Sequence, residues 1–247
     1  IHIEAGMRSG VWEMAEERNR VVTDQLSRLH LCPHQGAAAN LAAEGITSTA
    51  VVVGDVMYEV AASSYGMLDP ARFVTPKGLE VGAYAYLSCH RAENVDDARR
   101  LQALADVLQD LPCPVYFPLH PRTAGNIRRF GLSAAFESSG AILAPPATYC
   151  ENLALIRHAG VVVTDSGGVT REAYLFDVPT LTLREVTEWP ETVADGVNRL
   201  VAMDPQAARE GARAALARRG RRPRFSLVGD PPPSFRIAEA ITAFLSP

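Results

Sequence analysis

Short apolar segments alternate with amphipathic segments along the whole chain, and this alternation constrains the fold more than any single motif. Residues 49–53, 115–118 and 161–164 are rich in β-branched or aromatic side chains and are typical of strands. Residues 96–109 and 149–158 show the apolar spacing of helices. Strand–helix alternation is the pattern of a parallel sheet with crossover helices. The sequence therefore predicts an α/β fold.

Turn-forming residues interrupt this alternation between residues 65 and 80, where glycine, proline and aspartate cluster. We expect residues 1–66 to be the C-terminal part of a first Rossmann-like domain, with a linker to about residue 80. Residues 80–247 are expected to form a second Rossmann-like domain, and the terminal helix to pack back on the first. Because the chain opens on what is predicted as a strand, residues 1–4, we also expect the first domain to be incomplete.

Composition narrows the classes of function. The net charge of −4 gives no reason to expect nucleic acid as a partner. No apolar run approaches the roughly 20 residues of a transmembrane helix, so we expect no membrane partner. The four cysteines are scattered without a Cys-x-x-Cys pair, which argues against a zinc site or a disulfide framework and fits a cytoplasmic setting. We expect no metal.

The turn Thr-Asp-Ser-Gly-Gly at residues 164–168 lies between a predicted buried strand and a predicted helix. Such a turn exposes backbone N–H groups at the positive end of a helix dipole, where a phosphate or diphosphate can bind. Glu172 lies about one helical turn further on, where a carboxylate can accept hydrogen bonds from ribose hydroxyls. The alternative is an ordinary tight connection capped by Ser166.

Further polar residues follow other predicted strands. Glu4 ends the first strand and is placed to act as a general base, unless it only pairs with Arg8. Glu16 begins a helix, where a carboxylate also complements the helix dipole. His90 and His120 follow neighbouring strands and are acid/base candidates near neutral pH, although a lone histidine is more often structural. We expect the two histidines, the Ser-Gly-Gly turn and Glu172 to lie at one edge of one sheet.

Six motifs, in this order and spacing, resemble those of the non-hydrolysing UDP-N-acetylglucosamine 2-epimerase family. They lie at residues 2–8 (HIEAGMR), 15–20 (AEERNR), 90–94 (HRAEN), 118–122 (PLHPR), 165–172 (DSGGVTRE) and 184–191 (REVTEWPE).

The resemblance implies a GT-B-like fold of two domains with the active site in the cleft between them. It implies anti elimination of UDP from a UDP-N-acetylhexosamine, giving a 2-acetamidoglycal, followed by re-addition of UDP after proton return to the opposite face of carbon 2. A UDP-sugar is then the substrate, no cofactor is needed, and a homodimer in bacterial cell-surface polysaccharide biosynthesis is expected.

The resemblance also assigns roles to residues of this sequence. Glu4 and Glu16 are the acid/base candidates, and His90 is a catalytic or diphosphate-stabilising group. Substrate or UDP binding is assigned to Arg8, Arg91, Glu93, Asn94, His120, Arg122, Ser166, Gly167, Gly168, Glu172, Arg184, Thr187 and Glu191.

The chain departs from the common family pattern in ways that bear on the substrate. Trp189 stands where an arginine is usual, and Arg171 where an acidic residue is usual. The Trp189 form resembles the branch acting on UDP-2,3-diacetamido-glucuronic acid, so the sugar stays open. Two alternatives also stay open: a GT-B glycosyltransferase that uses a UDP-sugar, and a catalytically incomplete UDP-binding module.

Overall fold

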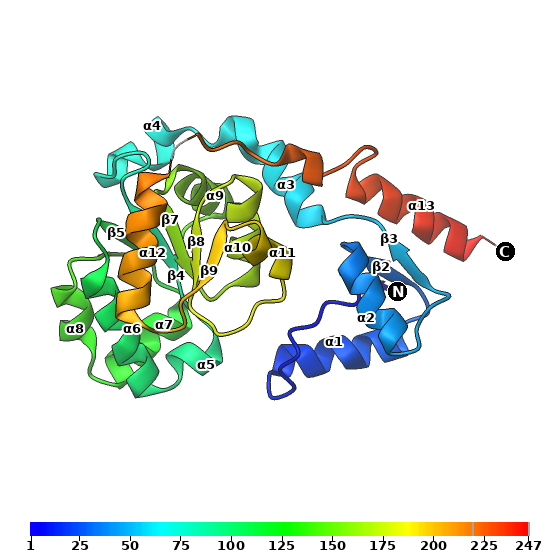
Figure 1. The fold of residues 1–247 in the computed structure, drawn as a ribbon, viewed down its shortest axis with the longest axis horizontal. Helices are drawn as coiled ribbons and strands as arrows, with labels where there is room; N and C mark the ends of the chain where they lie inside the picture. Colours follow the sequence, from blue (N-terminus) through cyan, green and yellow to red (C-terminus); the bar gives the residue numbers. More distant parts are fainter. Residues whose placement is uncertain (219, 247) are drawn as a thin grey trace. The chain divides into compact units, whose positions relative to one another are not determined.

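The computed structural model describes residues 1–218 and 220–246 (Figure 1). The chain forms two compact units: Ile1–Ser63 with Phe225–Pro247, and Ser64–Arg224. Each unit contains a parallel sheet, which confirms the expected α/β class. Residues 67–80, expected as a linker, belong to the second unit, because the short helix α4 (Pro70–Phe73) packs on α9 (Tyr149–His158).

The sheet of the second unit has six parallel strands in the order β6-β5-β4-β7-β8-β9. The chain builds β4, β5 and β6 outward on one side and then returns to the other side of β4 with β7. The strand order therefore reverses between β4 and β7, and ligands of open α/β sheets bind outside the carboxyl ends of the strands at such a point. The strands are β4 (Ala85–Ser88), β5 (Val115–Pro118), β6 (Ile142–Ala144), β7 (Val161–Thr164), β8 (Thr180–Thr182) and β9 (Asn198–Leu200).

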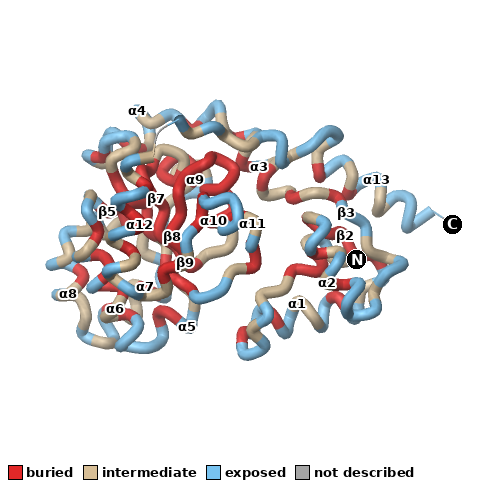
Figure 2. The backbone as a smooth tube through the Cα atoms, in the orientation of Figure 1, coloured by how far each residue is buried: buried red, intermediate tan, exposed pale blue. Residues whose placement is uncertain are grey.

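Helices cover both faces of this sheet, because successive strand residues point to opposite sides. Leu87 and Val163 point into the main core, which α6 (Ala98–Asp110) and α12 (Pro205–Ala217) cover. On the other face, the Tyr84 hydroxyl donates a hydrogen bond to the Leu155 carbonyl of α9 at 2.5 Å. Figure 2 shows β4, β7 and β8 buried between these layers. The remaining helices are α5 (Ala92–Val95), α7 (Pro121–Arg129), α8 (Ser133–Ser138), α10 (Gly167–Leu175) and α11 (Pro190–Ala194), with 3-10 turns at Tyr65–Met67 and Thr75–Lys77.

Helix ends follow local capping chemistry more closely than the apolar pattern does. Helix α7 begins at Pro121, because the His120 side chain caps it and proline suits the first helical position. Helices α4, α5 and α8, of four to six residues, were not expected.

The first unit has three parallel strands in the order β1-β2-β3, and the C-terminal helix α13 returns to pack on it. Ser234 begins this packing: its backbone N–H and its hydroxyl donate to the Glu59 carboxylate at 2.8 and 2.6 Å. Ile237 then joins a core cluster with Leu31 and Val53. The elements are β1 (His2–Ile3), β2 (His30–Cys32), β3 (Ala50–Val52), α1 (Ala15–Leu26), α2 (Gln35–Ala43), α3 (Val56–Ser64) and α13 (Pro233–Leu245), with a 3-10 turn at Phe225–Leu227.

We expect Ile237→Ala to destabilise the first unit by about 2–4 kcal/mol, because it leaves a cavity in a small core. Phe235→Ala, on the same helix, removes a side chain that is 52% exposed and should cost far less. Hydrogen exchange of the Leu31 amide in β2 measures both effects. Equal loss of protection in the two variants would show that α13 does not stabilise this sheet.

Candidate functional site

Two loops leave the sheet side by side at its switch point. Strands β4 and β7 pair in register with Ser88 opposite Thr164, so residues 89–94 and 165–168 start at the same edge. These segments contain the motif at residues 90–94 and the first half of the motif at residues 165–172. The sheet topology therefore brings together loops that lie about 75 residues apart in sequence, as for His90 and Asp165.

The Asp165 carboxylate, only 1% exposed, joins these two loops. It accepts hydrogen bonds from the backbone N–H of His90 at 3.1 Å and of Arg91 at 2.9 Å. The Asn94 side-chain amide donates to it at 2.9 Å, and the Cys89 thiol at 3.2 Å. Burial beside this carboxylate raises the pKa of Cys89, which keeps the thiol protonated as a donor.

The turn that follows Asp165 begins helix α10. The Ser166 side chain caps the helix by accepting from the Val169 backbone N–H at 3.5 Å. A Cβ atom at Gly167 would lie 3.3 Å from Nε1 of Trp189, so a larger residue here would press on the Trp189 ring. A Cβ at Gly168 would meet only the Ser166 hydroxyl, at 3.8 Å. The first-turn N–H groups thus lie at the carboxyl edge of β7, as predicted.

Glu172 lies one turn into α10 and is buried. The Tyr149 hydroxyl hydrogen-bonds to it, and burial together with this carboxylate raises the pKa of Tyr149 well above its usual range. An ionised carboxylate has about four acceptor positions, so Glu172 can accept further hydrogen bonds while it holds Tyr149.

His90 and His120 lie next to one another, with ring centroids 5.4 Å apart. His120 caps α7: its Nδ1 accepts from the Arg122 backbone N–H at 3.2 Å, so the neutral ring has its proton on Nε2. The His90 ring is 38% exposed, and its Nδ1 lies 3.9 Å from Asp165, beyond hydrogen-bonding distance. The two strand-end histidines predicted from the sequence therefore meet.

A buried ion-pair cluster lies beside this edge. Arg184 pairs with Glu188 at 2.8 Å and with Glu93 at 3.3 Å, and Arg91 pairs with Glu188 at 3.3 Å. Burial alone would raise the pKa of Glu188, but the charges of Arg184 and Arg91 outweigh it and hold that pKa below its usual range. Glu188, which was not predicted as a site residue, thus joins the predicted residues Arg91 and Arg184, and Arg184 joins Glu93.

The segment after Arg184 is folded by its own contacts. The Thr187 hydroxyl accepts from the Trp189 backbone N–H at 3.1 Å, and Glu191 lies in the first turn of α11. The guanidinium of Arg171 lies over the Trp189 ring, 4.5 Å from its centroid. The two family departures noted in the sequence, at residues 171 and 189, are therefore in contact with each other as a cation–π pair.

Two predicted binding residues of this unit have structural contacts. Both Arg122 nitrogens Nε and Nη2 bind the Asp96 carboxylate, which lowers the pKa of Asp96. Asn94 is fully buried, and its side-chain oxygen accepts from Arg100 at 3.0 Å. Substrate contact by either residue stays a prediction.

In the first unit, Glu4 directly follows β1 with a backbone φ of +68°. A non-glycine residue in this left-handed region is strained, and such strain is concentrated at functional sites. Glu16 is exposed in the first turn of α1. Its neighbour Glu17 is buried and accepts from the backbone N–H groups of Ser9 at 2.7 Å and Gly10 at 3.0 Å.

The predicted binding residue Arg8 lies in a network around Asp24, which the sequence interpretation missed. The Asp24 carboxylate is fully buried; Arg8 contacts it at 2.8 Å, His2 at 2.6 Å and the Gly6 backbone N–H at 3.2 Å. Arg8 also donates two hydrogen bonds to Glu44, at 2.7 and 2.8 Å. Nothing in the apolar pattern of α1 distinguishes Asp24, because it lies between exposed apolar residues of that helix.

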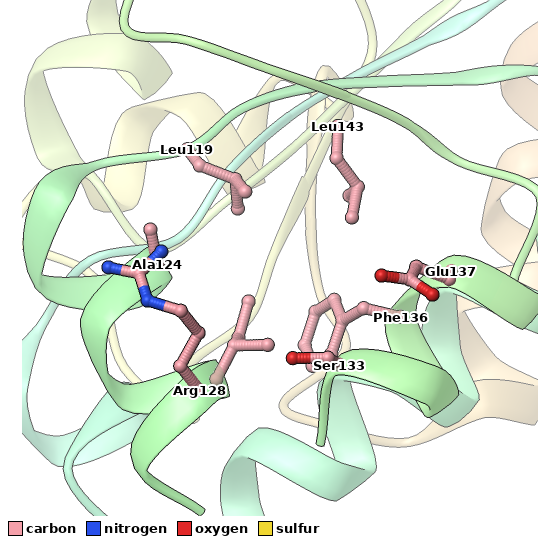
Figure 3. Close-up of a pocket in the computed structure, with 8 residues that line it drawn as sticks. Leu119, Ala124, Arg128, Ser133, Phe136, Glu137 and Leu143 are labelled. Carbon is pink, nitrogen blue, oxygen red and sulfur yellow. The ribbon is translucent and has the colours of Figure 1, made fainter. Parts of the chain in front are cut away.

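A cavity of about 210 Å³ opens between β5, β6, α7 and α8 (Figure 3). Its wall is mainly apolar, with Arg128 and Glu137 among the lining side chains, and none of the predicted site residues lines it. The lining residues are Leu119, Ala124, Ile127, Arg128, Ser133, Phe136, Glu137 and Leu143.

The described residues contain no group of three or more His, Cys, Asp and Glu side chains arranged to hold a metal ion. Within the same residues, no helix has the length and apolar character needed to cross a bilayer.

The fold defines a GT-B-like α/β protein, with the 3-2-1-4-5-6 strand order of a Rossmann sheet in its second unit. The sequence model of the UDP-N-acetylglucosamine 2-epimerase family matches residues 1–242, and the chain belongs to this family. The resemblance of the six motifs is thereby confirmed.

Known relatives support the same family. The chain is 40% identical over 224 residues to UDP-2,3-diacetamido-2,3-dideoxy-D-glucuronate 2-epimerase of Pseudomonas aeruginosa, which covers 88% of this chain and 60% of the relative. It is 36% identical to UDP-N-acetylglucosamine 2-epimerase of Methanocaldococcus jannaschii, covering 81% of this chain and 57% of that protein. The chain therefore spans about three fifths of the length of these relatives.

Solved structures of the family are also similar. The M. jannaschii UDP-GlcNAc 2-epimerase in complex with UDP-GlcNAc and UDP gives a TM-score of 0.87 at 32% identity, covering 98% of this chain and 68% of that one. The Neisseria meningitidis enzyme bound to UDP-GlcNAc gives 0.77 at 25% identity, covering 98% and 69%.

Asp24→Asn should destabilise the first unit by about 3–5 kcal/mol at pH 7, because it leaves the buried contacts of Arg8 and His2 without a carboxylate. Burial alone would raise the pKa of Asp24, but hydrogen bonds from His2, Arg8 and the Gly6 amide outweigh it and lower that pKa. The stabilisation is therefore complete above the unfolded pKa, about 4, and is lost as the pH falls through the lower folded pKa.

Urea unfolding of the wild-type and Asp24→Asn proteins between pH 3 and pH 7 measures this difference. Asp106→Asn, which neutralises an exposed carboxylate, is the control. A stability gap for Asp24→Asn that stays constant down to pH 3 would contradict the assigned contacts.

Proposed function

We propose that this chain contributes to the epimerisation of a UDP-sugar at carbon 2 as an isomerase. The observation that supports this most directly is the switch-point edge, where the Ser166 turn, His90 and His120 meet in a member of the epimerase family. Relatives named as 2-epimerases of UDP-GlcNAc and of UDP-2,3-diacetamido-2,3-dideoxy-D-glucuronate support the substrate class.

In this proposal the α10 N-terminus binds the diphosphate of UDP. Its first-turn N–H groups are oriented donors, and the helix end has roughly half a positive charge. Ser166 caps the helix, Gly167 and Gly168 have no side chain that would cover its first turn, and His120 adds the Nε2–H donor. Glu172 accepts from the ribose hydroxyls with the acceptor positions that Tyr149 leaves.

The chemical step needs proton transfer at carbon 2 on both faces of the sugar. A base removes the proton, the C–H electrons form the C1=C2 double bond, and the C1–O bond breaks as UDP leaves. Protonation of carbon 2 from the opposite face and return of UDP to carbon 1 complete the change. We assign acid/base roles to Glu4 and Glu16, and His90 to catalysis or stabilisation of the leaving diphosphate. The strained backbone at Glu4 supports the first assignment.

The sugar is either a neutral UDP-N-acetylhexosamine or its diacetamido uronate analogue. The 40% identity to the glucuronate enzyme and the Arg171–Trp189 pair support the uronate. The experiment therefore uses both UDP-sugars as substrates.

Incubation in heavy water with each UDP-sugar should introduce deuterium at carbon 2, read by mass spectrometry. Glu4→Gln and His90→Ala should each lower this exchange by about 10²–10⁴-fold, the contribution typical of a positioned acid or base. Glu13→Gln, which changes an exposed carboxylate of the same unit, is the matched control.

Other results of this experiment would indicate a different activity for the chain. UDP binding without exchange or UDP release would indicate a UDP-binding module, and acceptor-dependent sugar transfer without deuterium uptake would indicate a glycosyltransferase. Normal exchange in Glu4→Gln would remove that residue from the mechanism. The homodimer and the cytoplasmic setting stay predictions. Light scattering, which measures molar mass, tests the homodimer.

A further inference from the structure

Asp165 begins the loop after β7, and its carboxylate accepts hydrogen bonds from the loop after β4. It therefore connects the two loops of the switch-point edge. We propose that Asp165 is a positioning residue, which fixes the main chain of His90 relative to the Ser166 turn. This inference rests on the proposed function for its effect on turnover, but the contacts that it concerns exist in the free protein. It assigns a role to a residue outside the predicted binding set.

Four donors converge on one oxygen of the carboxylate, Oδ2. The backbone N–H of His90, the backbone N–H of Arg91, the Asn94 amide and the Cys89 thiol all donate to it, at 2.9 to 3.2 Å. Because Asp165 is only 1% exposed, its role is to hold the chain rather than to contact the sugar.

The coupling to His90 passes through the main chain. Nδ1 of His90 lies 3.9 Å from Asp165, whereas the His90 backbone nitrogen lies 3.1 Å from it. A carboxylate–imidazole hydrogen bond of the kind that orients a catalytic histidine is thus absent between these two described residues. Asp165 instead fixes where the His90 backbone lies and leaves the ring exposed to solvent.

Asp165 also belongs to the Ser166 turn, the second of the two loops that it connects. Asp165 immediately precedes Ser166, and its own backbone N–H donates to the Ser88 carbonyl at 3.2 Å. The Thr123 hydroxyl donates to the Cys89 carbonyl at 2.7 Å, which holds the start of the same loop. Any shift of His90 against the Ser166 turn must therefore break hydrogen bonds to a buried charge, the stronger kind of protein hydrogen bond.

Asp165→Asn tests this arrangement, because asparagine keeps the volume but removes the negative charge that strengthens the hydrogen bonds converging on Oδ2. We expect kcat for carbon-2 exchange to fall by about 10–100-fold, as for loss of one to two charged hydrogen bonds, while KM changes by less than about 3-fold. In the free protein, hydrogen exchange of the His90 and Arg91 amides, measured by NMR, should accelerate by a similar factor.

Asp177→Asn is the matched control. Asp177 is also a buried carboxylate next to α10, at its other end, and it accepts from the Arg222 backbone N–H at 3.0 Å and pairs with Arg218 at 2.7 Å. Its loss should lower stability but leave kcat and the His90 amide within about 2-fold of wild type, since no contact to residues 89–94 is removed.

Unchanged His90 and Arg91 exchange in a folded Asp165→Asn protein would overturn the proposal, as would lost protection with unchanged kcat. If Asp165→Asn does not fold, the wild-type protein decides: the His90 and Arg91 amides should exchange at least about 10-fold more slowly than unprotected amides, and unprotected amides would refute the contact. Failure of the proposed function would give a different result from failure of this inference. Wild-type protein would then show no deuterium at carbon 2, while the His90 and Arg91 amides would still be protected and would still lose protection in Asp165→Asn.

Discussion

The parallel pairing of β4 with β7 is the constraint on which the candidate site depends. The register that sets Ser88 opposite Thr164 makes both strands end at one level, so the loops that follow them must be neighbours. The six-stranded order places this pair at the sheet's switch point, where the flanking crossover connections diverge and leave room outside the strand ends. His90 and the Ser166 turn owe their proximity to this topology and not to their separation in sequence.

A buried carboxylate performs a similar task in each unit. Asp24 holds the loop after β1 through the Gly6 amide, as Asp165 holds the loop after β4 through His90 and Arg91. Burying an unpaired charge costs several kcal/mol, so both carboxylates are tolerable only because several donors contact each of them. Loops without regular hydrogen bonding acquire fixed geometry in this way, which a functional edge needs.

Much of the second unit could be predicted from the sequence, because its strands are continuous apolar runs buried on both faces, as in Val161–Thr164. The strand-end positions of His90, His120 and Ser166 followed from the same pattern. Helix α1 shows what the pattern misses: it buries Glu17 and Asp24 and exposes Val22 and Leu26, the reverse of an amphipathic expectation. Both buried carboxylates accept hydrogen bonds from the loop after β1, and such partners are not visible in local sequence.

The charges near the Ser166 turn also limit how an anion is held there. Arg91 and Arg184 are balanced by Glu188 and Glu93, so this cluster alone offers little net attraction. The two acids differ in exposure: the Glu188 side chain is 2% exposed, whereas Glu93 is 40% exposed, so solvent screens the Glu93 contact more strongly. We infer that a diphosphate bound as proposed displaces Glu93 from Arg184, whereas Glu188 keeps the guanidinium in place. Under the proposed function, the backbone N–H groups of α10 attract the diphosphate at all times. Arg184 adds its charge only when the diphosphate takes the place of Glu93.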